Sequence, residues 1–416
     1  MTELIDAAQA VLRANDRGGY TVPTDRLYPF QWNWDSAFVA LGWATFDEDR
    51  AWREIERLLE GQWDDGMVPH IVFHVPSDDY FPGPDVWGTK HRPATSGVTQ
   101  PPVLATVVRR LFDATGAAER AAALYPKLLA WHRWWAKARD PQGTGLVAIL
   151  HPWESGMDNS PAWDLALARV PMSGVTPIRR RDTRHIGADM RPQDDEYRRY
   201  IALVDLFRTL RWEPEAMWAH TPFKVADVGI NAMLHRAETD LLALAGGFGQ
   251  PGDEDEIALR LERRRQAMPG LWNEAAGLFE PFDLIAQAPV PVATSAGFLP
   301  LFAGLVDTRQ ARRMAAEIER WAEAVRYLVP SLSPRDPRFD AKRYWRGPVW
   351  AIVNRMIAEG LADYGQDALA TRIHGHTQAL VRRGGFAEYF DPTTGEGLGG
   401  ERFSWTAATA LSWAAP

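Results

Sequence analysis

Three turn-rich stretches of the chain combine acidic residues with aromatic ones. Glu154 and Asp158 stand in HPWESGMDNSP, residues 151–161, Asp35 follows two tryptophans in QWNWDSAF, and Glu388 comes just before the turn sequence DPTTG. Two carboxyl groups that face one another suit general acid/base chemistry, and they are the usual requirement for cleaving a glycosidic bond. Burial against aromatic rings would keep one of the two protonated near neutral pH.

Each of these acids also has a structural interpretation. Asp35 stands where a helix is expected to begin, and taken alone it fits an N-cap better than a sugar ligand. Glu154 either braces its own turn or contacts a ligand. Because every candidate acid could be a turn cap, spacing alone leaves open which two would act as a pair.

Three other motifs contain residue types that occur in metal sites, cofactor sites or pockets. His70 and His74 are four residues apart, but VPHIVFHVP is typical of an extended segment, and without an HExxH motif we expect no metal. GEGLGGE, residues 395–401, lacks the lysine of a P-loop and the strand–turn–helix setting of a dinucleotide fingerprint, so no cofactor is expected. Trp345 and Arg346 stand just before a helix entry, where they could face a pocket or pack on each other.

The elements that must hold these residues are almost all helical. Apolar residues recur every three and four positions in twelve runs, whereas strand-like alternation is scarce. Long loops rich in Pro, Gly, Trp and Asp carry most of the candidate residues, and no sharp repeat suggests a solenoid. We therefore predict an all-α fold, an (α/α)6 barrel whose long loops gather at one end, in a single domain over residues 1–416. The predicted helical runs are 4–15, 36–45, 49–63, 99–114, 117–138, 192–211, 226–246, 253–268, 308–328, 348–364, 367–382 and 404–414.

Composition narrows the class of protein. The 416 residues carry a net charge of −8, which argues against nucleic acid or an anionic membrane as a partner. There is no membrane-spanning apolar stretch, no signal-peptide core and no cysteine, so we expect a cytoplasmic protein without disulfides. The nineteen tryptophans, many of them in polar loops, favour stacking on sugar rings. Whether the protein is a homo-oligomer stays open.

Five segments together resemble the glycoside hydrolase family that includes processing α-glucosidase I (family 63) and its bacterial relatives, in a clan shared with the trehalases. The motifs are QWNWDSAF, VPHIVF followed by VTQPP, ESGMDNSP, YWRGPVW, and EYFDPTTGEG followed by FSWTAA, in this order over nearly the whole chain. The resemblance implies an (α/α)6 barrel, in agreement with the helical pattern, and hydrolysis with inversion at the anomeric carbon.

The resemblance also implies roles for individual residues. Asp158 matches the general acid, and Glu388 matches the general base that activates water. In an inverting enzyme the two carboxyl groups stand roughly 6.5–9.5 Å apart, and we expect a raised pKa for Asp158 and an ionised Glu388. The residues that match or adjoin sugar-binding positions are Tyr28, Trp32, Trp34, Asp35, His70, Gln100, Gly156, Trp345 and Arg346.

Within that family the chain looks most like compact bacterial members that hydrolyse mannosylglycerate or glucosylglycerate, so the expected partner is a small anionic sugar substrate. Three other functions stay open: hydrolysis of another small α-glucoside such as trehalose, sugar binding without catalysis on the same barrel, and a lyase or epimerase reaction. A substrate carboxylate needs a cation or several donors. The candidate cations are Lys90, His91, Arg92, Arg179, Arg180, Arg181 and Arg184.

Overall fold

The helices of the protein lie where the apolar pattern predicts them. The computed structural model describes residues 2–25, 27–77, 79–175, 178, 187 and 190–413. Its long helices coincide with the twelve predicted runs, and three shorter ones lie between the runs: α4 (Pro84–Trp87), α7 (Asp164–Ala168) and α9 (Pro214–His220). No helix in the described ranges is long and apolar enough to cross a membrane.

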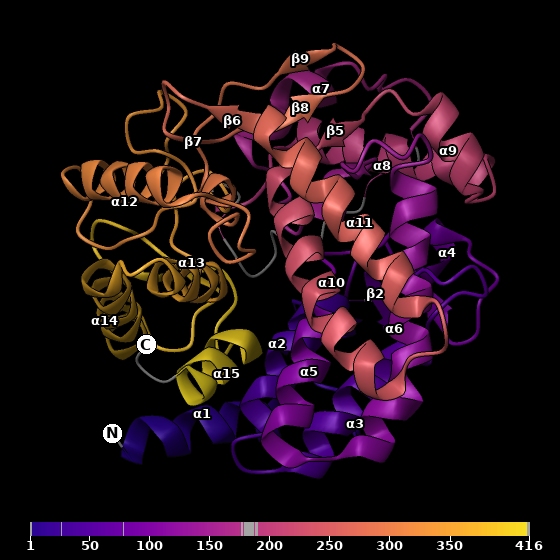
Figure 1. Cartoon of the computed structure of the whole chain (residues 1–416), viewed down its shortest axis with the longest axis horizontal. Coiled ribbons are helices and arrows are strands. Elements are labelled where there is room, and N and C mark those ends of the chain that lie inside the picture. Colours follow the sequence, from indigo (N-terminus) through magenta and orange to yellow (C-terminus); the bar gives the residue numbers. More distant parts are fainter. Residues whose placement is uncertain are drawn as a thin grey trace.

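Two layers of helices, one inside the other, form the body of the protein (Figure 1). The inner layer is a ring of neighbouring helices: α2 (Asn33–Trp43), α5 (Leu104–Thr115), α10 (Val228–Phe248), α13 (Ala351–Asp363) and α15 (Ser404–Ser412). The outer layer consists of α1 (Thr2–Asn15), α3 (Glu48–Leu59), α6 (Ala118–Arg139), α11 (Asp253–Ala267), α12 (Thr308–Ala322) and α14 (Asp367–Gly384). This arrangement is an (α/α)6 barrel, which confirms the predicted fold.

The sequence of each helix decides its layer. Every residue of α2, NWDSAFVALGW, is buried, so this helix has no face that it could turn to water. In α3, EDRAWREIERLL, the apolar side chains of Ala51, Trp52, Ile55 and Leu58 are buried on one face, and the other face is largely charged. A helix of the first kind must be covered on all sides, whereas one of the second kind covers others.

The ring departs from six regular helical hairpins at one position. Between α10 and α13 the inner layer is completed by the short 3-10 helix η6 (Ser295–Phe298) and the turns after it. Gly360 of α13 permits this approach, because a Cβ there would lie 2.3 Å from the amide nitrogen of Phe302. The run predicted at 192–211 forms α8 (Asp194–Thr209), which packs on α4 instead of joining the wall.

Short antiparallel strands tie together the loops that precede the inner helices. β1 (Gln31–Trp32) leads directly into α2 and pairs with β2 (Ile71–Phe73), which in turn pairs with β3 (Ala94–Thr95). The other sheets are β4 (Ala148–Ile149) with β5 (Val225–Ala226), β8 (Phe282–Asp283) and β9 (Ala288–Pro289), then β6 (Trp272–Asn273) with β7 (Leu278–Phe279), and β10 (Tyr389–Phe390) with β11 (Gly397–Leu398).

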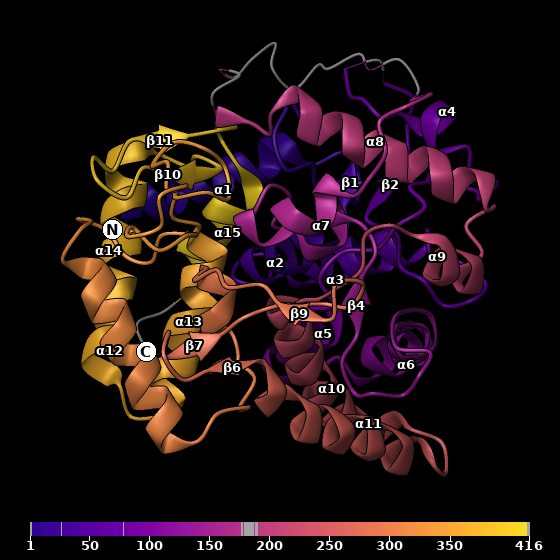
Figure 2. The ribbon, with the colours of Figure 1, turned by 90° about the horizontal axis from the view of Figure 1, so that it is seen from above.

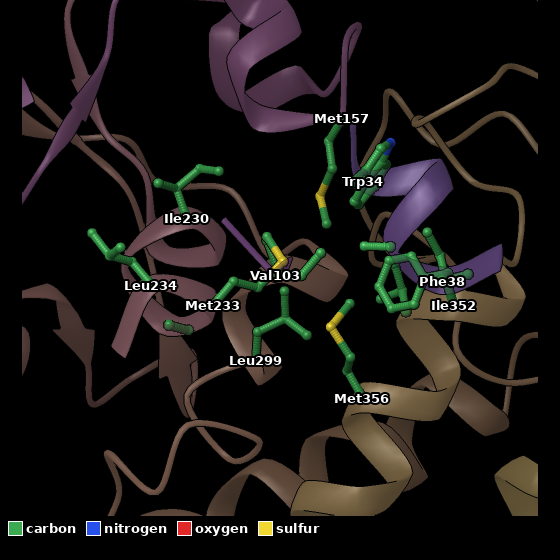
Figure 3. Packing of buried hydrophobic residues seen from close by; sticks show 14 of the residues in the cluster. Trp34, Phe38, Val103, Met157, Ile230, Met233, Leu234, Leu299, Ile352 and Met356 are labelled. Carbon is green, nitrogen blue, oxygen red and sulfur yellow. The ribbon is translucent and has the colours of Figure 1, made fainter. Parts of the chain in front are cut away.

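Side chains from facing inner helices fill the ring. Trp34 and Phe38 of α2 and Ile352 of α13 lie on one side of this core, and Ile230 and Leu234 of α10 lie on the other (Figure 3). All five are buried. Met157 joins the same cluster of buried side chains. The turn that carries Asp158 therefore rests on an apolar floor.

Candidate active site

A cavity opens at the end of the barrel where the inner helices begin. It holds about 670 Å³ of empty space, its open mouth included. Its walls come from the first turns of the inner helices, from the loops before them and from the first turn of α8, which carries Tyr197. The lining residues are Pro23, Tyr28, Trp32, Trp34, Asp35, His70, Tyr80, Phe81, Gln100, Trp153, Gly156, Asp158, Arg191, Pro192, Tyr197, Tyr344, Glu388, Phe403 and Trp405.

Nine of the eleven residues singled out from the sequence line this cavity, including both candidate catalytic acids. They come from segments as far apart in the chain as Tyr28 and Glu388, and the fold brings them together around one space. The nine are Tyr28, Trp32, Trp34, Asp35, His70, Gln100, Gly156, Asp158 and Glu388.

Asp158 is half-buried, with its carboxyl group at the cavity. Burial raises its pKa, the Arg191 guanidinium lowers it and the negative charge of Glu388 raises it, and together these effects place the pKa at about 7. In the described parts of the chain, the one hydrogen bond that its carboxyl group accepts comes from its own backbone. A carboxyl group with this pKa is protonated about half of the time near neutral pH, as a general acid requires.

The turn before Asp158 is built so that it can lie against α2. Gly156 has a φ of +70°, and a side chain there would collide with the Trp34 ring, because a Cβ would lie 2.8 Å from it. Glu154 is fully buried in an ion pair with Arg139 and accepts the Leu150 N–H at 2.8 Å. Of the two interpretations of Glu154, the structure supports the brace.

Glu388 has a different environment from Asp158, although it lines the same cavity. Its Oε1 accepts a hydrogen bond from the Tyr28 hydroxyl at 3.1 Å, and its Oε2 accepts the Gly400 N–H at 2.9 Å. Arg191 Nη1 lies 3.7 Å from Oε1. Burial raises the pKa of Glu388, and the arginine and both hydrogen bonds oppose that rise. These groups stabilise the carboxylate form, which is the form that a general base needs.

Asp35 shares the cavity with these two acids. The N-cap of α2 is Trp32, whose side chain makes no capping bond, and Asp35 lies inside the first turn. The N-cap interpretation of Asp35 was therefore wrong, because the helix begins earlier, directly after β1. Burial raises the pKa of Asp35 well above its usual value, and the charges of Glu388 and Asp158 add to the effect.

His70 and Gln100 complete the polar part of the wall. Burial lowers the pKa of His70 well below its usual value, so the ring is neutral, and it stacks on Trp153 with centroids 5.8 Å apart. Gln100 Oε1 accepts the backbone N–H of Trp34 at 3.3 Å, which fixes its amide toward α2.

Trp345 and Arg346 do not line the cavity. Trp345 stacks on Trp350 with ring centroids 3.8 Å apart and lies beside Trp34, one layer behind the wall. The Arg346 guanidinium bonds Asp164 at 2.5 Å and Glu196 at 2.8 Å, so it links α7 with α8.

Several lining residues were not singled out from the sequence. Arg191 is 5% exposed, and its guanidinium lies 4.3 Å from the Tyr344 ring centroid and 5.7 Å from that of Tyr28. Arg191 lies in one of the long loops, residues 170–192, and Tyr344 opens the motif YWRGPVW. The sequence identified the segments that carry Arg191 and Tyr344 but not these two side chains.

The cations suggested for a substrate carboxylate lie elsewhere. Lys90 and Arg92 are exposed, the ring of His91 stacks on Trp63 at 4.1 Å, and none of the three lines the cavity. Arg179, Arg180, Arg181 and Arg184 lie outside the described residues. Arg191 is the only arginine or lysine that lines the cavity among the residues that the structure describes.

The same described residues contain no group of three or more His, Asp or Glu side chains that could hold a metal ion. His74 has partners of its own, since its Nε2 pairs with Gln31 Oε1 at 2.7 Å and its ring packs on Tyr20. His70 and His74 therefore do not act as a pair of ligands.

Comparisons with known proteins identify close relatives over the full chain. The family model "Mannosylglycerate hydrolase MGH1-like glycoside hydrolase domain" matches residues 28–406. A mannosylglycerate hydrolase of Thermus thermophilus is 54% identical over 413 residues, which cover 98% of this chain and 99% of the relative. A glucosylglycerate hydrolase of Mycolicibacterium hassiacum is 37% identical, with 99% and 98% covered. The crystal structure of a family 63 mannosylglycerate hydrolase from Thermus thermophilus in complex with Tris and D-glycerate has a TM-score of 0.96 at 54% identity and covers 99% of both chains.

Proposed function

Because the chain belongs to the family of mannosylglycerate hydrolase MGH1-like glycoside hydrolases, we propose that it hydrolyses 2-O-α-mannosylglycerate to mannose and glycerate with inversion at the anomeric carbon. Glucosylglycerate is the second substrate to test, since a relative of that name is 37% identical. The observation that carries the proposal is the pair of acids in one cavity, with a raised pKa at Asp158 and hydrogen-bond donors around Glu388.

The reaction needs one proton donor and one proton acceptor on opposite sides of the sugar. Asp158 donates its proton to the glycosidic oxygen as the bond to the anomeric carbon breaks. Glu388 accepts a proton from water, and that water attacks the anomeric carbon from the opposite face. The product is the β-anomer, and one turnover leaves Asp158 ionised and Glu388 protonated until both exchange with solvent.

The remaining polar groups of the cavity divide between the two parts of the substrate. Asp35, His70 and Gln100 line the cavity together with Trp32 and Trp34, a combination that suits hydroxyl groups and an apolar sugar face. Arg191 suits the glycerate carboxylate, since a guanidinium can bind a carboxylate through two parallel hydrogen bonds. A neutral disaccharide such as trehalose has no carboxylate that Arg191 could bind.

The experiment is hydrolysis of mannosylglycerate and glucosylglycerate, followed by proton NMR of the anomeric signal in the first minutes. We expect the β-anomer to appear first with the wild type and no turnover with Glu388→Gln. Initial release of the α-anomer would contradict inversion. A folded wild type that cleaves neither glycerate but cleaves trehalose would replace the proposed substrate with a neutral one.

A further inference from the structure

Tyr200 of α8 contacts both ends of the turn that carries the general acid. His151 Nε2 lies 3.0 Å from the backbone oxygen of Tyr200, and the Tyr200 hydroxyl donates to the backbone oxygen of Asp158 at 2.9 Å. His151 and Tyr200 are both fully buried. One residue of α8 thus holds residues 151 and 158 at the same time, through its backbone at one end and its side chain at the other.

The direction of the first hydrogen bond follows from the other ring nitrogen of His151. Nδ1 accepts the backbone N–H of Trp153 at 3.0 Å, so the proton of the neutral ring is on Nε2 and points to the Tyr200 oxygen. Burial lowers the pKa of His151 to about 3, which keeps the ring neutral over the working range of pH. The contact is therefore a fixed donor–acceptor pair and does not switch with pH.

The rings of these residues pack together behind the cavity wall. The His151 ring centroid lies 4.5 Å from that of Trp153 and 5.8 Å from that of Tyr200, and the Trp153 and Tyr200 centroids are 5.7 Å apart. Trp153 also lines the cavity. The turn therefore has little room to move toward or away from α8.

Independent contacts hold α8 to the rest of the protein. Arg346 bonds Glu196 in its first turn, and Arg199 Nη1 donates to the backbone oxygens of Leu167 at 3.2 Å and Ala168 at 3.0 Å. α7 and α8 consequently lie side by side (Figure 2). Since α8 is anchored in this way, it can serve as a fixed support for the turn.

We propose that His151 and Tyr200 are positioning residues for Asp158, which clamp both ends of the turn 151–158 onto α8 and so aim the carboxyl group at the glycosidic oxygen. This inference rests on the proposed function, in which Asp158 is the general acid. Neither residue lines the cavity, so neither is expected to touch substrate. Their effect should appear only in the step that needs proton donation.

Two substrates with different leaving groups isolate that step. Mannosylglycerate needs protonation of its leaving oxygen, whereas fluoride leaves from α-mannosyl fluoride without it. For Tyr200→Phe, which keeps the ring and removes the hydroxyl, we expect kcat on mannosylglycerate to fall about 10- to 100-fold with KM little changed. Hydrolysis of the fluoride should stay within about twofold of the wild type. Asp158→Asn should likewise lose kcat on mannosylglycerate and keep its activity on the fluoride, with a larger difference between the two substrates.

A matched pair of variants at His151 tests the other end of the clamp. The Asn side chain reaches the position of Nδ1 and keeps the cap on Trp153, whereas Gln reaches the position of Nε2 and keeps a donor toward Tyr200. We expect His151→Asn to lose activity on mannosylglycerate while it keeps its activity on the fluoride. His151→Gln should show a much smaller difference between the two substrates. Equal losses on both substrates in Tyr200→Phe and His151→Asn would mean general damage to the site and would overturn the inference, as would no loss in either.

An activity-independent measurement separates failure of this inference from failure of the proposed function. We would titrate the Asp158 carboxyl group by carbon-13 NMR, with Asp158→Asn to assign the signal. Among the titratable or charged groups around it, Asp35, Arg191, Tyr344 and Glu388 are unchanged in these variants. The Tyr200 hydroxyl, which Tyr200→Phe removes, is neutral because burial raises its pKa well above the usual value. Loosening the turn should admit water and lower the pKa of Asp158 in Tyr200→Phe. An unchanged pKa in the folded variant would contradict the positioning role of Tyr200, even if the wild type cleaves neither glycerate.

Discussion

Glu154 and Asp158 lie four residues apart in one turn, but their carboxyl groups have opposite surroundings. Glu154 is fully buried, paired with Arg139 and bonded to the Leu150 N–H. Asp158 faces the cavity and receives no hydrogen bond from another described residue. The comparison teaches that a buried acid with a complete set of partners stabilises the fold, whereas an acid left without them keeps its proton for chemistry.

The largest effect should come from removing the acid that lacks partners. Asp158→Asn cannot donate a proton, and general acid catalysis contributes about 10²- to 10⁴-fold, so we expect kcat on mannosylglycerate to fall by that factor. In the wild type the alkaline limb of the kcat/KM profile should lie near pH 7, where Asp158 loses its proton. Steady-state kinetics from pH 5 to 9 would check both, and an active Asp158→Asn enzyme would show that the acid is another residue.

Glu154 should behave in the opposite manner. Glu154→Gln leaves the Arg139 charge buried without its partner, and breaking a buried pair costs roughly 3–5 kcal/mol of stability. Urea unfolding measures the loss, with the exposed Glu119→Gln as a matched control expected within about 0.5 kcal/mol of the wild type. A Glu154→Gln protein as stable as the wild type would break the distinction drawn between the two acids.

The Asp158 carboxyl group should reduce the stability of the folded protein, by an amount that depends on pH. Because its pKa is about 7 in the folded protein and about 3.9 in the unfolded chain, the folded state binds more protons between these values. Stability therefore falls as pH rises from about 4 to about 7, by up to about 4 kcal/mol. Asp158→Asn escapes this loss, so its advantage over the wild type should be present at pH 8 and absent near pH 4. Urea titrations at both pH values test it, with the exposed Asp6→Asn expected to show no such difference.

The sequence could predict the helices and the segments that carry the candidate acids, but not the surroundings of each acid. The helical runs were correct because apolar residues recur every three and four positions where a helix buries a face, and that recurrence is visible in a single sequence. The motifs identified Asp158 and Glu388 as candidates. The boundary of α2 was not predicted, because Trp32 begins the helix without a capping side chain, and Asp35 was accordingly misread as the cap.

The sequence could not predict which charged residues far apart in the chain lie in contact in the fold. Arg139 lies at the end of α6 and Glu154 beyond a strand, and nothing in their spacing predicts that they form an ion pair. Arg191 approaches Glu388 from almost two hundred residues away, and it belongs to a loop without periodicity. Arg346 stands in the motif YWRGPVW, yet it bonds Asp164 and Glu196 instead of facing the cavity. Those partners decide which charged residues do chemistry.

The smallest expected effect comes from Arg191, which lies beside the other catalytic acid, Glu388. Arg191→Gln removes a charged hydrogen-bond donor that is worth about 1.5–3 kcal/mol, so KM for mannosylglycerate should rise roughly 10- to 100-fold. The KM for α-mannosyl fluoride, which has no carboxylate, should not rise. The arginine also lowers the pKa of Glu388. Without it the base is protonated at higher pH, and the acidic limb of the rate profile moves to higher pH for both substrates.

The control is Arg92→Gln, at an exposed cation outside the cavity, which should change neither the KM nor the position of that limb. An unchanged KM with a shifted limb would assign Arg191 to the base alone and leave the glycerate carboxylate to other donors, whereas a raised KM with an unshifted limb would mean that Tyr28 and Gly400 suffice to keep Glu388 ionised.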